Sequence, residues 1–209
     1  MQYKTIPVTS FAENCTIIWC EKTKKAAIVD PGGECEQIKA LVKQLDVAIE
    51  KILLTHGHLD HVGAASELAQ YYDVAIYGPT AQDQFLLDNL PHQAVQFGFP
   101  FASAFQPDYW LKDGETLVLG EQILNVIHCP GHTPGHIVFI NKVAKVALVG
   151  DVLFKGSIGR TDFPGGNYQD LMYSIKQKLL PLGDDILFIS GHGPMSTFGY
   201  ERKTNPFLI

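Results

Sequence analysis

The sequence predicts an α/β fold in which two sheets pack against each other and helices cover their outer faces. Short runs rich in β-branched and aromatic residues fall into two sets along the chain. Each set is followed by segments whose apolar residues recur at helical spacing. Two sets of strands, each with its own helices, favour a layered sandwich over one doubly wound sheet.

The first half of the chain alternates predicted strands with predicted helices. Strands are expected at residues 2–8, 14–20, 25–29, 51–55 and 74–77. Helices are expected after residue 33, with apolar Ile38, Leu41, Val42 and Leu45 on one face, and over residues 62–72 and 80–89. Asp30-Pro31-Gly32-Gly33 marks the turn before the first of these helices. Residues 91–110 are rich in aromatic side chains without either period, so we expect an irregular segment that packs as core or walls a pocket.

The second half repeats the scheme after Gly114. Strands are expected at residues 116–119, 122–127, 137–141, 146–149 and 186–190, and a helix at 168–180. No repeat or linker interrupts the 209 residues, so we expect one domain spanning residues 1–209. A chain of this length buries a sufficient core without a structural metal, and a bound metal would therefore serve chemistry.

Charge and composition narrow the classes of partner. The net charge is −6 and the Lys and Arg residues are scattered, which disfavours nucleic acid as a partner. The N-terminal residues MQYKTIPVTSF lack the pattern of a signal peptide, and no apolar run reaches membrane-spanning length. The four cysteines, Cys15, Cys20, Cys35 and Cys129, form no C-x-x-C pair, as expected for reduced thiols. We therefore expect a cytoplasmic protein without a membrane partner, and the oligomeric state stays open.

The densest chemical signal is the segment His56-Gly57-His58-Leu59-Asp60-His61. Three of the eight histidines of the chain fall within these six residues, directly after a predicted strand. Gly57 allows the chain to turn tightly there, and imidazole and carboxylate are ligands that suit zinc, iron or manganese. A helix-capping role explains Asp60 by itself, but not four such residues together. The segment therefore predicts a metal site.

Three later strands each lead into one further candidate ligand. His132 lies in the Pro- and Gly-rich loop 129–136, Asp151 follows the strand 146–149, and His192 follows the strand 186–190. A carboxylate at the end of a buried strand is costly unless it is paired or bound to a metal, and polar groups at strand ends commonly build the sites of layered α/β folds. Each residue also has an ordinary interpretation, as a helix cap, a turn former or a loop histidine respectively.

Together, the H-x-H-x-D-H run and the downstream His132, Asp151 and His192 resemble the metallo-β-lactamase superfamily. The resemblance spans nearly the whole chain and implies a four-layer αββα sandwich with two divalent metal ions, expected to be Zn²⁺, with iron or manganese as alternatives. It implies that His56, His58 and His132 bind the first ion, that Asp60, His61 and His192 bind the second, and that Asp151 bridges them.

Within the superfamily, the Pro-Gly-His-Thr-Pro-Gly-His stretch and residues 156–166 most resemble glyoxalase II-type hydrolases, also called hydroxyacylglutathione hydrolases. The short tail after His192 is similar to a bacterial subgroup that lacks the helical C-terminal domain. The resemblance implies hydrolysis of a small-molecule thioester such as S-D-lactoylglutathione. A water between the two metals would be the nucleophile, and Asp60 would orient it.

The sequence departs from the well-known glyoxalase II enzymes where a Lys and a Tyr hold the glutathione portion. Arg160 and Asp162 stand at these places. Arg160 can bind a carboxylate through its guanidinium fork, but an ionised Asp162 cannot donate a hydrogen bond as the Tyr does. Arg202 and Lys203 are further candidates for binding substrate, or are a solvated surface pair.

Three residues are candidates for supporting the ligands from behind. They are Asp30, Thr133 and His136. Metal-bound histidines usually donate their second ring N–H to a carboxylate, a carbonyl or water. Asp30 can equally be the first residue of a β-turn.

Other functions stay open at this point. A persulfide dioxygenase shares the scaffold and the Gly-Arg-Thr-Asp-Phe stretch at 159–163, and would use one iron bound by His56, His132 and Asp151. A hydrolase of a different thioester or ester, and a non-catalytic protein that has kept the fold, are further alternatives. A β-lactamase is disfavoured because no export signal is visible.

Overall fold

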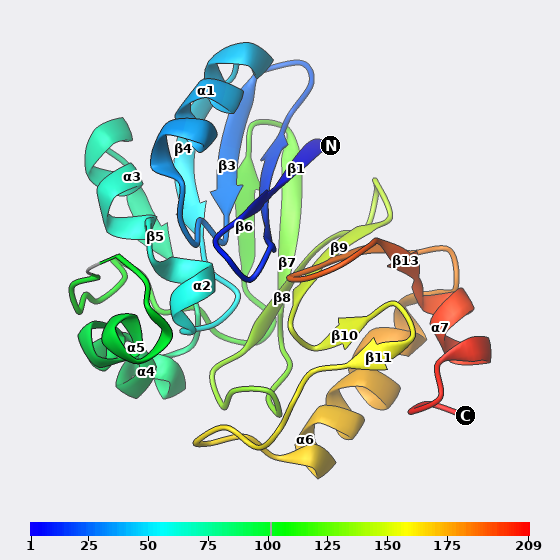
Figure 1. Cartoon of the computed structure of the whole chain (residues 1–209). Coiled ribbons are helices and arrows are strands. Elements are labelled where there is room, and N and C mark those ends of the chain that lie inside the picture. Colours follow the sequence, from blue (N-terminus) through cyan, green and yellow to red (C-terminus); the bar gives the residue numbers. More distant parts are fainter. Residues whose placement is uncertain (101) are drawn as a thin grey trace.

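The computed structural model describes residues 1–100 and 102–209, and two sheets form its framework (Figure 1). The first sheet has the strand order β1 (Gln2–Val8), β2 (Glu13–Trp19), β3 (Lys25–Val29), β4 (Ala48–Leu53) and β5 (Ala75–Tyr77). The second has the order β13 (Ser196–Thr197), β12 (Leu187–Ser190), β9 (Val146–Gly150), β8 (Ile137–Asn141), β7 (Gln122–His128) and β6 (Thr116–Leu119). A small third sheet pairs β10 (Leu153–Phe154) with β11 (Ser157–Ile158).

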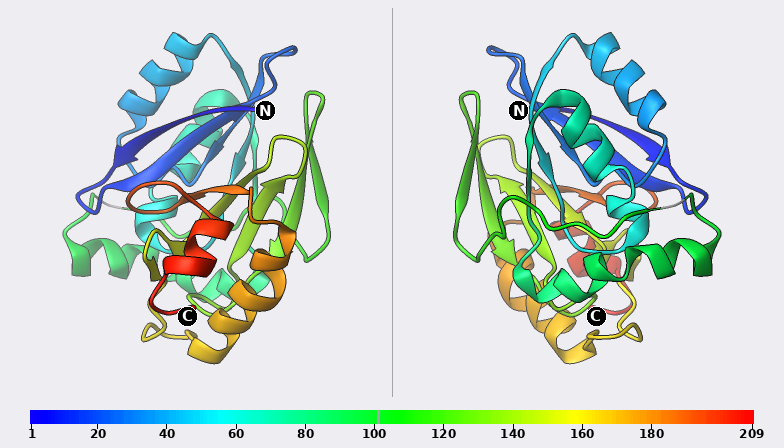
Figure 2. Two further views of the ribbon diagram at one scale, coloured as in Figure 1. Left: turned by 90° about the vertical axis from the view of Figure 1, so that its right-hand side faces the viewer. Right: turned by 90° about the vertical axis from the view of Figure 1, so that its left-hand side faces the viewer.

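Helices cover the outer faces of the two large sheets. The first half contributes α1 (Cys35–Leu45), α2 (Leu59–Val62), α3 (Ala65–Tyr72), α4 (Gln84–Asp88) and α5 (Leu90–Phe97). The second half contributes α6 (Tyr168–Tyr173), which continues as a π-helical segment (Ser174–Leu179), and α7 (Phe198–Thr204). Figure 2 shows α1 on the first sheet, and α6 and α7, in orange and red, on the second. Among the described residues, no helix is long and apolar enough to cross a membrane.

Inner strands of both sheets, such as β3, β8 and β9, are buried on two faces, and alternate side chains enter different apolar layers. In β3, Ile28 packs in the layer under α1 and α3, whereas Val29 packs in the layer between the two sheets. In β9, Val149 packs in the layer under α6 and α7, whereas Leu148 packs between the sheets. Three apolar layers therefore separate four structural layers, which confirms the predicted αββα sandwich.

One edge of the sandwich gathers the ends of the strands that precede the candidate ligands. β3, β4 and β5 run parallel to one another, as do β9 and β12, so their carboxyl ends lie at the same edge within each sheet. The two sheets are joined there, because the Asn14 N–H donates to the Gly191 carbonyl (2.7 Å) and the Ile137 N–H to the Thr55 carbonyl (2.8 Å). Layered α/β folds commonly build their sites at such an edge.

Several sequence predictions differ from the structure. The predicted helix 62–72 is found as α3, which begins only at Ala65, because Gly63 and Ala64 form a turn that separates it from the preceding helix α2. The expectation of an irregular segment over 91–110 is wrong for its first part, since α5 ends only at Gly98, with φ of 69°. α5 forms because Leu90 and Ala94 lie buried on one face and Pro91 suits a first turn. Phe101, also in that stretch, lies outside the described residues.

Short elements near the C-terminus were not predicted. These are β10, β11, β13 and α7. Three of them are strands of two residues, too short to show the alternation on which strand prediction depends. α7 begins at Thr197, whose hydroxyl accepts a hydrogen bond from the Tyr200 N–H at 3.2 Å, a capping signal that the sequence does contain.

Candidate metal centre

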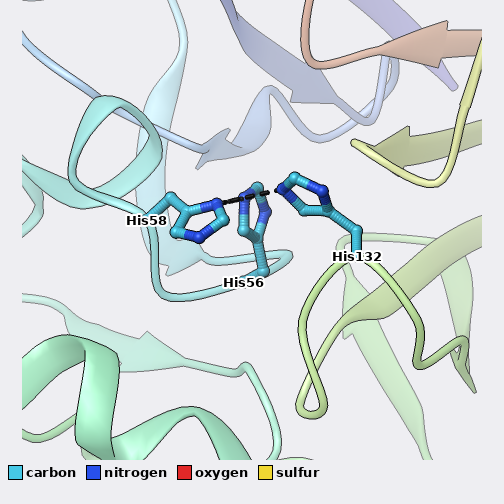
Figure 3. Close-up of side chains that lie close together, drawn as sticks. All are labelled: His56, His58 and His132. Atoms are coloured by element: carbon cyan, nitrogen blue, oxygen red, sulfur yellow. Dashed lines mark hydrogen bonds between the residues drawn. The ribbon is translucent and has the colours of Figure 1, made fainter. Parts of the chain in front are cut away.

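Three histidines from two loops point their ring nitrogens toward one another (Figure 3). His56 and His58 follow β4, and His132 lies between β7 and β8. The Nδ1 atom of His58 lies 3.0 Å from the Nε2 atoms of both His56 and His132. Nitrogen ligands around one tetrahedral zinc lie about 3.3 Å apart, for bond lengths of about 2.0–2.1 Å. The spacing of the three nitrogens therefore suits a single small cation.

Hydrogen bonds set the ring orientation of two of these histidines. The Thr55 hydroxyl donates to Asp30 Oδ2 (2.6 Å) and therefore accepts from His56 Nδ1 (3.0 Å). His132 Nδ1 donates to the Arg160 carbonyl at 2.8 Å. Both rings thus carry their proton on the outer nitrogen and direct the lone pair of Nε2 inward, as a metal ligand must.

The same three histidines are held neutral. Burial lowers the pKa of His56 well below its usual value and lowers the pKa of His132. Burial, with the neighbouring His132, lowers the pKa of His58 to about 3. Neutral imidazole is the form that binds a metal, so this cluster is ready to bind a cation near neutral pH.

A second cluster contains Asp60, His61 and His192, whose potential ligand atoms lie within 4.8 Å of one another. Asp60 Oδ2 lies 3.2 Å from His192 Nε2 and 3.9 Å from His61 Nε2. His192 Nδ1 donates to the Phe11 carbonyl (3.1 Å), and His61 Nδ1 lies 3.1 Å from Asp30 Oδ2. The Nδ1 atoms of both histidines are therefore engaged, and the Nε2 atoms of His61 and His192 both face the Asp60 carboxylate.

Asp151 lies between the two clusters. Its Oδ1 lies 3.4 Å from His61 Nε2, and its Oδ2 lies 3.6 Å from His132 Nε2 and 3.7 Å from His192 Nε2. Oδ1 and His61 Nε2 are buried and have no hydrogen-bond partner among the described residues. Buried polar atoms are seldom left unpaired, and cations between these atoms would satisfy them. The donor set therefore fits two adjacent divalent ions.

The electrostatics of the second cluster favour positive charge. Although burial lowers the pKa of His61, the charges of Asp151 and Asp60 raise it well above the usual value. Burial likewise lowers the pKa of His192, but the hydrogen bond that its ring donates to Asp60 and the charge of Asp151 raise it overall. Burial raises the pKa of Asp151, but His61 outweighs that effect and lowers it. A metal ion at this cluster would take the place of protons.

The structure places the three predicted supporting residues around the ligands. Asp30 accepts hydrogen bonds from the Thr55 N–H (2.8 Å) and the Thr55 hydroxyl, and lies beside His61 Nδ1. It also has φ of 50°, so a role in the turn accompanies these contacts. The Nε2 atom of His136 accepts from the Asp151 N–H (3.0 Å). Thr133 does not contact a ligand ring, and its hydroxyl donates to Asp83 Oδ2 at 2.8 Å.

Asp83 is a residue at the site that sequence reasoning missed. Its carboxylate, fully buried, accepts hydrogen bonds from the Gly57 N–H (2.9 Å), the Thr133 hydroxyl (2.8 Å) and the Gly135 N–H (2.6 Å). It thereby joins the turn between His56 and His58 to the loop that carries His132. Burial raises its pKa to about 6. No local signal marks it, because an acidic residue in a predicted helix is ordinary.

Glu13 is the second missed residue. It is fully buried in β2, and neither side-chain oxygen has a hydrogen-bond partner among the described residues. Oε1 lies 3.7 Å from His61 Nδ1, and burial raises the pKa of the carboxyl well above its usual value. The sequence gives no clear signal for it, because Glu13 lies directly before the predicted strand 14–20 and beside the polar Asn14.

Of the three predicted substrate-binding cations, Arg160 is the one that the structure places at the cavity. Arg160 lines the cavity, but its guanidinium forms two hydrogen bonds with Asp162, at 2.9 and 2.7 Å. Arg202 donates to Asp184 Oδ1 (2.9 Å) and the Leu180 carbonyl (2.6 Å). Neither Arg202 nor Lys203 is among the described residues that line the cavity. For this pair the structure favours a surface position.

A cavity of about 770 Å³ opens onto both clusters. His58, Asp60, His132, Asp151 and His192 form its floor, and five phenylalanines contribute to its walls. A volume of this size is ordinary for a small-molecule site. The arrangement therefore combines a buried set of metal donors with a space for an organic substrate.

Comparison with known proteins extends these observations. The family model for the metallo-beta-lactamase superfamily matches residues 8–192. A Haemophilus influenzae protein named hydroxyacylglutathione hydrolase GloC is 53% identical, over 100% of this chain and 98% of the relative. The crystal structure of BLEG-1, described as a B3 metallo-beta-lactamase, has a TM-score of 0.92 and 35% identity, over 99% of each chain. TTHA1623 in a di-iron-bound form has a TM-score of 0.89 and 34% identity, over 98% of this chain and 100% of that one.

Proposed function

Because the chain belongs to the metallo-β-lactamase superfamily, we propose that it is a hydrolase that uses two adjacent divalent metal ions to cleave a thioester such as S-D-lactoylglutathione. One observation carries the proposal: Asp151 and His61 offer buried, unpartnered ligand atoms at the junction of two donor clusters. The name of the Haemophilus influenzae relative supports a glutathione thioester as substrate.

The proposed ligand sets follow the two clusters. The first ion would be held by His56, His58 and His132, and the second by Asp60, His61 and His192, with Asp151 between them. We propose Zn²⁺ for both positions, and iron or manganese as alternatives. Imidazole and carboxylate suit all three metals, and a similar structure was determined in a di-iron-bound form.

Bound at these positions, two ions would act as Lewis acids on the thioester carbonyl and lower the pKa of a water molecule. The contribution of the chain is orientation. Asp60, itself a member of the second cluster, also lines the cavity, and there its carboxylate would orient the attacking water. Asp30 and Thr55 hold His56 and His61 in place from behind. A thiolate is a good leaving group, so the site has no need of a separate general acid.

The proposal is tested by assaying purified protein of measured metal content against a panel of substrates. The panel contains S-D-lactoylglutathione, a generic acyl thioester, a β-lactam and glutathione persulfide, the last followed by oxygen uptake. We expect thiol release from the thioesters, loss of that activity on chelation, and recovery on adding Zn²⁺, Fe²⁺ or Mn²⁺. Oxygen consumption without thioester cleavage would instead indicate a persulfide dioxygenase, and cleavage of the β-lactam alone a β-lactamase.

A further inference from the structure

Five phenylalanine side chains from four segments line the cavity that contains the metal ligands. This aromatic collar comprises Phe11, Phe97, Phe99, Phe154 and Phe163. The Phe11 ring makes edge contacts with Phe97 (centroids 6.0 Å apart) and Phe99 (5.1 Å), which ties the β1–β2 turn to the end of α5. The collar is therefore built by tertiary contacts between separate segments.

The collar begins directly beside the candidate ligands. The Phe163 ring packs edge-on against His58 (5.0 Å) and His132 (5.7 Å), and Phe154 lies 6.2 Å from His192. The backbone carbonyl of Phe11 accepts the hydrogen bond from His192. Aromatic rings therefore lie directly beside ligand residues of both clusters, and we place the acyl group of a thioester against them.

Apart from the candidate ligands, the described residues that line the cavity carry little free charge, and their other polar side chains are uncharged: Asn89, Gln93, Gln96 and Ser157. Apart from the histidines, Arg160 is the only cationic side chain among the described residues that line it. Its charge is compensated by Asp162, and its guanidinium lies 4.5 Å above the Phe163 ring. Gln93 is also engaged, since it accepts from the Leu59 N–H (3.3 Å) and donates to the Leu86 carbonyl (2.9 Å).

The rim of the collar exposes apolar surface that an apolar ligand would cover. Phe11 is 46% exposed and Phe97 is 44% exposed. Removing such surface from water is favourable in proportion to the apolar area covered, and exposed apolar surface beside a cavity is typical of a binding site. A lactoyl group, with its single methyl, would leave most of this surface in water.

We infer that the preferred substrate is a thioester with an apolar acyl group, branched or aromatic, which packs within the aromatic collar. The inference rests on the thioester hydrolysis proposed above and specifies its substrate class. Water adds across the C–S bond, so that the acyl carbon gains the oxygen, the thiol leaves, and the products are a carboxylate, a thiol and a proton. No oxidant or other co-reactant takes part.

The test compares acyl groups on one thiol. The kcat/KM of the metal-loaded protein is measured for the glutathione thioesters of D-lactate, acetate, hexanoate and phenylacetate. We expect kcat/KM for hexanoyl and phenylacetyl thioesters to exceed that for the lactoyl thioester at least tenfold, mainly through KM. Cleavage of the lactoyl thioester at an equal or higher kcat/KM would overturn the apolar preference and leave thioester hydrolysis standing. Cleavage of none of them would overturn both.

Two variants distinguish a role of the collar in substrate preference from a general effect of removing an exposed phenylalanine. Phe97→Ala removes a rim side chain that is already part-exposed, and we expect it to reduce the phenylacetyl-to-lactoyl ratio of kcat/KM about tenfold. Phe207→Ala removes a phenylalanine that is 45% exposed and does not line the cavity, so the ratio should stay unchanged. An unchanged ratio in Phe97→Ala, in a folded variant with wild-type metal content, would overturn the role of the collar.

Discussion

The two halves of the sandwich supply the candidate metal ligands in different ways. The first half places four of them in one turn of six residues after β4, His56 to His61. The second half places one ligand after each of three separate strands, His132, Asp151 and His192. A local turn holds its own side chains together, whereas the second set converges only if β7, β9 and β12 have the correct register. The first half therefore carries the recognisable signal, and the second completes the site through tertiary structure.

The largest expected effect comes from the residue between the two clusters. Asp151→Ala removes the carboxylate that faces His61, His132 and His192. We expect loss of most bound metal and a fall in thioesterase kcat on the order of a thousandfold. Metal analysis and kinetics check this result. Asp185→Ala removes an exposed carboxylate paired with Lys145 and should change neither, and full metal content in Asp151→Ala would contradict the bridging role.

The next effect concerns the link between the two ligand loops. In Asp83→Asn one acceptor oxygen is replaced by an NH₂ group, which would face either the Gly135 N–H, at the place of Oδ1, or the Gly57 N–H and the Thr133 hydroxyl, at the place of Oδ2. We expect metal affinity to fall about ten- to a hundredfold, as for other residues that position ligands. Competition with a chelator measures the affinity, and Asp88→Asn, on the exposed face of α4, is the matched control. Unchanged affinity in a folded Asp83→Asn variant would show that each half positions its ligands independently.

A smaller effect is expected from pH, and it contrasts the two clusters. The pKa values of His61 and His192 are raised, so at pH values below them protons compete with metal for the second cluster. The histidines of the first cluster have lowered pKa values and bind no competing proton near neutral pH. Affinity at the second cluster should therefore rise as pH rises, by about tenfold per pH unit for each proton displaced. Stepwise metal titrations at pH 6 and pH 8 measure this difference. If metal affinity had the same pH dependence at both binding steps, protons would not compete with metal more strongly at the second cluster than at the first.

The smallest effect is expected at the C-terminal helix. Arg202→Ala and Lys203→Ala should leave kcat and KM within about twofold of wild type, as is usual for surface substitutions remote from a site. Arg202 is bound to Asp184 and the Leu180 carbonyl, and neither side chain lines the cavity. A selective rise in KM for glutathione thioesters in either variant would show instead that the substituted residue binds substrate.

The layered fold and the family were accessible from the sequence because their signals are local. Continuous apolar runs in β3 and β9 reflect burial on two faces, and the turn that contains His56 and His58 shows its histidines within a few residues. α5 was missed because only Leu90 and Ala94 form its buried apolar face, and two such residues are too few to show the helical period. The metal roles of the seven residues remain a prediction, since the structure establishes their proximity and not their occupancy.

By itself, the sequence determined that strands and helices alternate in two sets, and that imidazole and carboxylate groups follow particular strands. Only the tertiary structure decided which of these groups face one another, that Asp83 joins the two loops, that Glu13 lies unpaired behind His61, and that phenylalanines from four segments form one collar. The difference follows from the separation along the chain over which each interaction acts. Periodicity and turn chemistry act between neighbours in the chain, whereas hydrogen bonds and packing act between neighbours in space, which leave no periodic trace in a single sequence.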